Sequence, residues 1–210
     1  MVIYRVLIVC EGEKTEPNYF KSFNQIRKGG VVFEVDCEGK GFNTRKVVEE
    51  AIRLRDKAKE ENKPYDSVWA VFDRDSFKPH QFNGAIQKAK ESGIRCAWSN
   101  EAFELWYINH FEYRDTPMSR KDYQSKITSL ISRKEKGFRY RKNDKEMRRR
   151  LLNYGSEELA IQYSKKQEKA FNDERYADHN PETHVYELVE LLTGKDKHFN
   201  EYLRNDLSKE

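Results

Sequence analysis

The sequence predicts an α/β fold, in which a mainly parallel sheet is flanked by helices. In the first half of the 210-residue chain, short apolar runs alternate with segments whose apolar residues recur at helical spacing. This alternation is expected when parallel strands are joined by right-handed helical crossovers. The first run, over residues 4–10, is almost continuously apolar after Arg5, which is typical of a strand that is covered on both faces.

Four strands are expected in this half, over residues 4–10, 31–37, 67–72 and 94–98. Thr15 and Thr44 are suitable N-cap residues, so the first two helices are expected to begin immediately after them. Gly93 is placed to end the helix before the fourth strand. The apolar stripe of the first helix contains Tyr19, Phe20, Phe23 and Ile26.

From Ser119 onward, helical spacing dominates and no strand is predicted. Ser119 and Asp122 form a capping pattern that opens a helix, and a second helix is expected over about residues 156–171. For the last helix, Asn180 is the expected N-cap, with Pro181 in the first turn and Gly194 at the end. The second half is therefore predicted to be a helical appendage.

Two parts are expected: an α/β catalytic core over residues 1–112, and a mainly helical, basic region over residues 113–210 that packs on it. Residues 133–150 contain ten basic and three acidic side chains, whereas the whole chain has a net charge of +4, so the rest is slightly acidic. This distribution is typical of a protein that meets a polyanion. Basic residues interleaved with aromatic ones suit phosphate contact and base stacking. The expected nucleic-acid contacts are Arg139, Arg141, Lys142, Arg148, Arg149, Phe138 and Tyr140. A solvated loop and an ATPase-docking surface are the alternatives.

The composition points to the cytoplasm. No apolar run approaches the roughly 18 residues that a membrane span needs, and the first residues lack the pattern of a secretory signal. Cys10, Cys37 and Cys96 show no metal-binding spacing, and each lies in or at the end of a strand-like run. We expect them to be buried free thiols in a reducing compartment.

Acidic residues follow three of the four predicted strands. Glu11 follows the first strand, Asp73 and Asp75 follow the third, and Glu101 and Glu104 follow the fourth. The carboxyl ends of parallel strands meet at one edge of the sheet, where ligands bind. Carboxylates within about 4–6 Å of one another either raise each other's pKa or bind a cation. Oxygen ligands without His or Cys favour Mg²⁺ or Mn²⁺ as the cofactor.

The pattern also assigns roles to the individual residues. Asp73 and Asp75 can share a metal, because alternate side chains of an extended segment point the same way. Glu11 is a further ligand or a general acid or base. Gly12 allows the backbone to turn sharply where a phosphate comes close, and Lys14 can hold that phosphate.

Several residues keep two interpretations. Glu16 is best explained as a helix-start residue, since the helix dipole favours anions there, and Glu13 is undecided. Glu104 is either a metal ligand or a solvated residue of an amphipathic helix. His179 and His184 bracket a turn and could approach the site, although a structural role is preferred. The chain lacks a GxxxxGK[ST] motif, so any ATP hydrolysis has to come from a partner.

Four segments together carry a resemblance to a known family. They are VCEGEKTEPNYF, FDRDS, SNEAFELW and NPETHVYELV, and they extend from Val9 to Val189. They resemble the RloB family, Toprim-related proteins found with bacterial restriction and abortive-infection loci. Glu-Gly after the first strand and Asp-x-Asp after a later strand are similar to the Toprim fold of topoisomerases, primases and OLD-type nucleases.

The resemblance implies a Toprim-like sheet and a metal-dependent nuclease, encoded beside an AAA- or ABC-type ATPase. Glu11, Asp73 and Asp75 would take the acidic Toprim positions. The assignment of Glu101 and Glu104 to the site rests on the RloB similarity and on geometry. The leading hypothesis is cleavage of DNA or RNA in phage defence. The alternatives are a non-catalytic module that senses nucleic acid or nucleotide and regulates an ATPase, and a nucleotidyl transferase, which the lack of zinc motifs disfavours. Homo-oligomerisation stays open.

Overall fold

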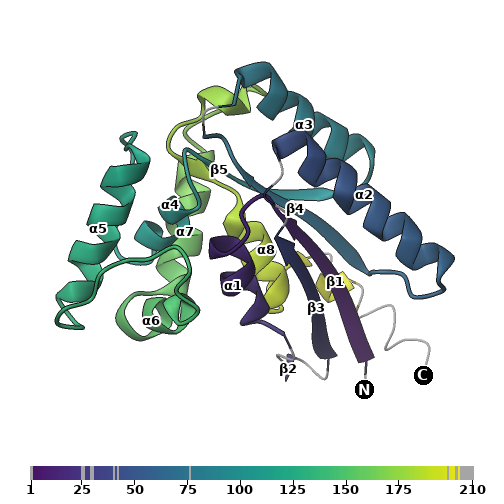
Figure 1. Cartoon of the computed structure of the whole chain (residues 1–210), viewed down its shortest axis with the longest axis horizontal. Helices are drawn as coiled ribbons and strands as arrows, with labels where there is room; N and C mark the ends of the chain where they lie inside the picture. The colour runs from purple at the N-terminus through teal and green to yellow at the C-terminus, as the bar shows by residue number, and fades with distance from the viewer. Residues whose placement is uncertain are drawn as a thin grey trace.

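The computed structural model describes residues 2–24, 27–28, 31–39, 41, 43–75, 77–197, 199–201 and 203. Within these ranges the strands form one six-stranded sheet with the order β2-β3-β1-β4-β5-β6. Helices cover both faces of the sheet (Figure 1), and the predicted α/β class is confirmed. Ile26, which was expected in the apolar stripe of the first helix, lies outside the described residues.

Four parallel strands form the centre of the sheet. They are β1 (Val2–Cys10), β3 (Val31–Gly39), β4 (Ser67–Asp73) and β5 (Arg95–Asn100). All four were predicted, with bounds that differ by at most about two residues. The antiparallel edges are β2 (Arg27–Lys28) and β6 (Glu182–Thr183).

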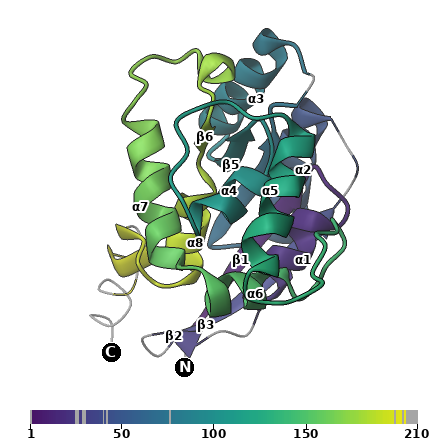
Figure 2. The ribbon, with the colours of Figure 1, turned by 90° about the vertical axis from the view of Figure 1, so that its left-hand side faces the viewer.

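Alternate side chains of β1 enter two separate cores, as the strand period requires. Leu7 and Val9 face α2 (Thr44–Glu60) and α3 (Pro79–Glu91), which cover one side of the sheet. Val6 and Ile8 face the larger core on the other side. Figure 2 shows the helices that lie on that side of the sheet. That core is covered by α1 (Thr15–Lys21), α4 (Glu104–Asn109), α5 (Arg120–Ser132), α6 (Met147–Tyr154), α7 (Glu157–Glu168) and α8 (Val185–Leu192). A short 3₁₀ turn, η1 (Tyr176–Asp178), lies beside α3.

The caps of the helices were predicted in part. Ser119 caps α5, and Gly93, with a φ of +68°, follows the end of α3, as expected. Thr44 is the first residue of α2 rather than its cap, because Asn43 accepts the hydrogen bond from the Lys46 backbone N–H. Thr15 likewise begins α1 and does not cap it.

The segment before the last helix differs from the prediction. Pro181 follows a cis peptide bond, and the next two residues form β6 against β5 instead of a first helical turn. The helix begins at Val185, so the expected roles of Asn180 and Pro181, and the absence of strands after residue 119, were wrong. A two-residue strand is too short to show a period. Gly194, with a φ of +72°, does follow the helix end as predicted.

The chain beyond residue 112 contributes directly to the sheet. It supplies the edge strand β6 as well as α8, which packs against β5. Tyr123, Leu151 and Val189 from this part share one core with Val6 of β1. In the part of the chain that is described, no helix has both the length and the apolar character needed to cross a bilayer.

The cysteines are free. Cys10 and Cys37 are buried on neighbouring strands, with their Sγ atoms 3.7 Å apart, whereas Cys96 is partly exposed. The prediction of buried free thiols is therefore confirmed for Cys10 and Cys37 only.

Candidate active site

Backbone hydrogen bonds bring three strand ends together. The Glu11 N–H donates to the Val71 carbonyl at 2.8 Å, which places the residue after β1 beside β4. The Asp75 N–H donates to the Glu101 carbonyl at 3.3 Å, which joins the loop after β4 to the end of β5. The acidic segments therefore meet at one edge of the sheet, as the sequence predicted.

A pocket of about 330 Å³ lies at this edge. Carboxylates from the ends of β1 and β4 and from α1 and α4 face it together with three cations. Its lining comprises Glu11, Gly12, Glu13, Lys14, Thr15, Glu16, Asp73, Asp75, Phe103, Glu104, Arg120 and Lys142. We call it the acidic pocket.

Glu11 is fixed at the entrance of the pocket by the backbone. Its Oε2 accepts a hydrogen bond of 3.1 Å from the Asp73 N–H. Burial raises the pKa of Glu11 to about 7, because the hydrogen bond and Arg120 only partly offset the loss of solvent and the repulsion from Glu16 and Asp75. A carboxyl group with this pKa exchanges protons near neutral pH, as a general base should.

Asp73 and Asp75 share one counter-ion, Arg120. The Arg120 guanidinium lies 3.6 Å from Asp73 Oδ2 and 3.2 Å from Asp75 Oδ2. Burial, followed by the repulsion of neighbouring carboxylates, still raises the pKa of Asp73 well above its usual range. Asp75 has a φ of +37°, so the expected extended Asp-x-Asp segment was wrong. The two carboxylates converge because the chain turns, with the Arg74 guanidinium donating to the Asp75 carbonyl at 3.0 Å.

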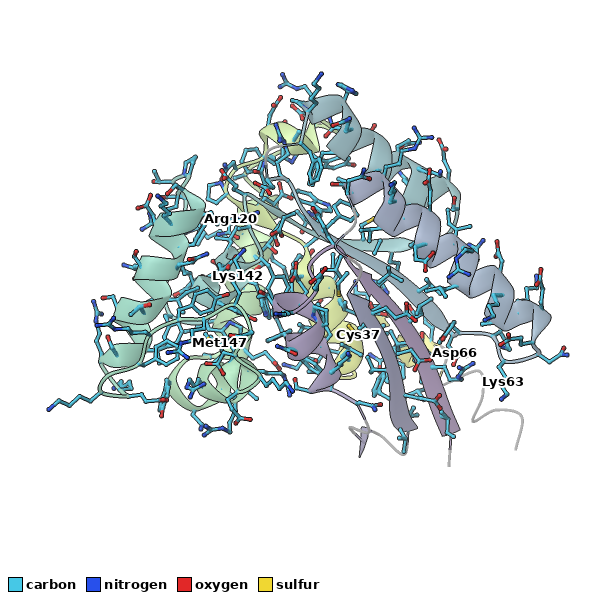
Figure 3. The ribbon with its side chains drawn as sticks, in the orientation of Figure 1. Cys37, Lys63, Asp66, Arg120, Lys142 and Met147 are labelled. Atoms are coloured by element: carbon cyan, nitrogen blue, oxygen red, sulfur yellow. The ribbon has the colours of Figure 1, made fainter. Side chains whose placement is uncertain are left out.

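Arg120 was missed by the sequence analysis. It is the first residue of α5, directly after the Ser119 cap, and its side chain is 31% exposed. Its contact with β4 links segments that are distant in the chain, and no local pattern indicates such a contact. Figure 3 labels Arg120 and Lys142, which in this view lie between α5 and α1.

Glu16 was assigned to the helix start alone, and this interpretation was incomplete. The residue is 6% exposed and lines the pocket. Burial, and then the neighbouring Glu104, raise its pKa. Its position in the sequence gives a usable signal, because Glu16 precedes Tyr19 and Phe20 by three and four residues and so shares their buried helix face.

Glu104 belongs to the pocket as well. It is 2% exposed, and its Oε1 accepts a hydrogen bond of 3.0 Å from the Tyr140 hydroxyl. The alternative of a solvated surface position is therefore wrong. Glu101, in contrast, lies outside the lining of the pocket, and the contact that it makes there is through its backbone carbonyl.

The loop after β1 contributes its charges at the rim. Lys14 and Glu13 are exposed residues that line the pocket, which is compatible with the predicted phosphate contact of Lys14. Gly12 has a steric role that was not predicted. A Cβ atom at Gly12 would lie 2.2 Å from a carboxylate oxygen of Glu16, so glycine is required for Glu16 to enter the pocket.

Residues 133–150, which we call the basic segment, reach the acidic pocket at one residue, Lys142. The Lys142 carbonyl accepts a hydrogen bond of 3.0 Å from the Thr15 hydroxyl, which ties the segment to α1. Arg139, Arg141 and Arg149 are exposed, and the first two line a neighbouring cavity of about 430 Å³.

Three predicted nucleic-acid contacts turn inward instead. Phe138 is 8% exposed and packs in the larger core. Tyr140 is partly buried and bonded to Glu104, and Arg148 stacks on the Phe23 ring at 3.6 Å. Phe138 and Tyr140 alternate with exposed cations because they face the inner side of a folded loop, whereas Arg148 lies on α6. The structure therefore does not support base stacking by these two aromatic rings or phosphate contact by Arg148.

His179 and His184 hold a buried carboxylate next to β5. Glu182 lies 2.8 Å from Nδ1 of His179 and 2.6 Å from Nε2 of His184. Burial lowers the pKa of His184, but its bonds to Glu182 and Glu187 outweigh this effect and raise the pKa to about 9. Neither histidine lines the acidic pocket, so the preferred structural role agrees with the geometry.

The carboxylates of the pocket fit a hard cation by their chemistry. Burial and mutual repulsion raise the pKa values of Glu11, Glu16 and Asp73, which indicates that positive charge is in short supply. Over the described ranges, however, no three His, Cys, Asp or Glu side chains are already arranged around a common point as metal ligands. Arg120 lies between the two aspartates instead.

Comparison with protein families gives one match, to the family described as RloB-like protein, over residues 6–192. The match covers most of the chain and contains all four segments on which the resemblance was based. No curated protein and no solved structure matches the chain.

Proposed function

Because this chain belongs to the RloB-like family, we propose that it is a Mg²⁺- or Mn²⁺-dependent nuclease of the Toprim type. The proposal rests on one observation: carboxylates from the ends of β1 and β4 and from α1 and α4 converge on one pocket that Lys14, Arg120 and Lys142 border. This combination suits a divalent ion together with a phosphodiester of DNA or RNA.

Each residue of the pocket has a distinct task in this proposal. Asp73, Asp75 and Glu104 would hold the metal, which, when bound, activates water and neutralises charge on the scissile phosphate. Glu11 Oε2 is engaged by the Asp73 N–H, so Glu11 Oε1 is the oxygen that accepts the proton of the attacking water. The Lys14 ammonium orients the phosphate.

The biological setting is part of the proposal and is suggested by the family resemblance. We propose a cytoplasmic role in anti-phage defence by abortive infection, with an AAA- or ABC-type ATPase as the partner, since the chain has no GxxxxGK[ST] motif of its own. The exposed side chains of Arg139, Arg141 and Arg149 would contact the nucleic-acid backbone beyond the acidic pocket.

One observation favours a second function, that of a non-catalytic sensor of nucleic acid or nucleotide that regulates the ATPase. Arg120 already neutralises part of the charge of Asp73 and Asp75. In a sensor, these ion pairs would be permanent and the pocket would bind a phosphate without cleaving it.

Nuclease assays separate the two functions. The purified chain is incubated with plasmid DNA, single-stranded DNA or tRNA and Mn²⁺, alone and with the ATPase encoded beside it. We expect cleavage by the parent, and its loss in Asp73→Asn and Asp75→Asn with an unchanged circular dichroism spectrum. Asp178→Asn, at an exposed residue outside the pocket, is the matched control. Equal cleavage by Asp73→Asn and the parent contradicts the nuclease proposal, and binding without cleavage by the parent supports the sensor.

A further inference from the structure

Arg120 lies where a cation between the two aspartates would lie. One guanidinium serves both carboxylates, with Nη1 at 3.2 Å from Asp75 and Nη2 at 3.6 Å from Asp73. The surrounding acids outweigh burial and raise the pKa of Arg120, so the group stays charged. The acidic pocket thus contains its own counter-cation.

A divalent ion cannot simply be added to this arrangement. Mg²⁺ requires oxygen ligands at about 2.0–2.1 Å, which would bring it into the space between the carboxylates and the guanidinium. The two cations would then repel each other at short range in a partly buried site. Metal binding and the present position of Arg120 therefore oppose each other.

Arg120 is also free to leave. It enters the pocket from α5, whereas Asp73 ends β4 and Asp75 follows it, so the contact can open without a change in the sheet. The start of α5 is fixed independently, because the Ser119 hydroxyl accepts the Asp122 N–H at 3.3 Å. In addition, Nε of Arg120 is buried without a hydrogen-bond partner, so the present position satisfies the side chain only in part.

We propose that Arg120 is a displaceable counter-cation that competes with the divalent metal for Asp73 and Asp75. This inference rests on the proposed function of the pocket. When the metal binds, the guanidinium turns away from the aspartates, and a phosphate of the nucleic acid offers it two new acceptor oxygens. Arg120 therefore makes the free protein bind metal weakly and couples metal binding to substrate binding.

Calorimetric titration with Mn²⁺ in the absence of nucleic acid tests this role. We expect Arg120→Gln to bind Mn²⁺ at least about tenfold more tightly than the parent, because one opposing charge is removed. Lys126→Gln is the matched control, since Lys126 lies on the same helix, is 30% exposed, pairs with Glu112 at 2.8 Å and does not line the pocket. It should bind Mn²⁺ as the parent does.

The outcomes are distinguishable. If the parent binds Mn²⁺ and Arg120→Gln binds it equally or more weakly, the role of Arg120 is wrong and the metal site stands. If neither protein binds Mn²⁺, both this role and the metal-dependent function are wrong. Should Arg120→Gln fail to fold, Arg120→Lys keeps the charge with a shorter side chain and a weaker pair, and a gain of about threefold is expected. No gain in Arg120→Lys would then overturn the proposal.

Discussion

The Tyr140 hydroxyl lies 3.0 Å from Oε1 of Glu104 and joins the basic segment to the floor of the acidic pocket. Glu104 begins α4, and Tyr140 also packs against Tyr107 of the same helix. The position of residues 139–142 at the pocket is therefore set by one buried polar contact as well as by apolar packing.

Tyr140→Phe removes the hydroxyl and leaves a buried carboxylate oxygen without its donor. We expect the free energy of unfolding to fall by about 1–3 kcal/mol, the usual cost of an unsatisfied buried group. Urea denaturation monitored by fluorescence measures it. Tyr163→Phe is the control, because Tyr163 does not line the pocket and the loss of its hydroxyl should change stability by less than about 0.5 kcal/mol. Equal effects of the two changes would show that the bond to Glu104 contributes little.

Glu11 should make stability depend on pH. Its folded pKa of about 7 lies above the value of about 4.5 for the unfolded chain, so the folded protein retains the proton more strongly. The free energy of unfolding therefore falls as Glu11 ionises between about pH 4.5 and about pH 7. Above that window the loss stays constant. We expect Glu11→Gln to gain melting temperature over the parent between pH 5 and pH 8. Glu60→Gln, at an exposed residue of α2, should show no such trend, and a Glu11→Gln difference independent of pH contradicts the shifted pKa.

Gly12→Ala should disturb Glu16. The new methyl group would lie 2.2 Å from the Glu16 carboxylate, which has little room to move because the residue is buried. We expect a loss of about 1–3 kcal/mol, typical of overpacking, in thermal or urea unfolding. A double-mutant cycle identifies the cause: in a Glu16→Ala background the same substitution should cost less than half as much. An undiminished cost would place the clash elsewhere.

The exposed and buried residues of the basic segment should respond differently to substitution. If the nucleic-acid proposal is right, Arg139→Gln with Arg141→Gln lowers affinity for single-stranded DNA and reduces the salt slope by about 1.4, the value for two phosphate contacts. Melting temperature should hardly change. Arg148→Gln should lower the melting temperature and hardly change the affinity or its salt slope, because Arg148 stacks on Phe23 and lies 3.6 Å from Glu157. Fluorescence anisotropy over a salt series, with thermal melting, distinguishes the two. Unchanged binding in the double variant would exclude these arginines from the interface.

The sheet and its acidic edge were predictable because both are local signals. Continuous apolar runs mark β1 and β4, and Glu11 and Asp73 follow directly from the ends of these strands. The burial of Glu16 could have been predicted in the same way, since this residue lies in phase with the buried face of α1. The contact of Arg120 with Asp75 could not be predicted from the sequence, because it depends on how α5 is placed against the sheet.

The same distinction applies to the second half of the chain. Helices α5 and α7 have a clear period and were both predicted, α5 together with its Ser119 cap. Strand β6 has two residues, and only its pairing with Ser99 and Asn100 defines it as a strand. The orientation of Phe138 could not be inferred from its neighbours, since an aromatic residue between arginines is equally compatible with an exposed and with a buried ring.

The position of α5 in the chain has a consequence for synthesis on the ribosome. All the acidic strand ends, up to Glu104, leave the ribosome before Arg120, and β6 follows later still. A nascent chain that folds from its N-terminus therefore passes through a stage with an uncompensated acidic edge and an uncovered β5. Translation has to pass residue 120 before Asp73 and Asp75 gain their counter-ion, and residue 183 before the sheet gains its last strand.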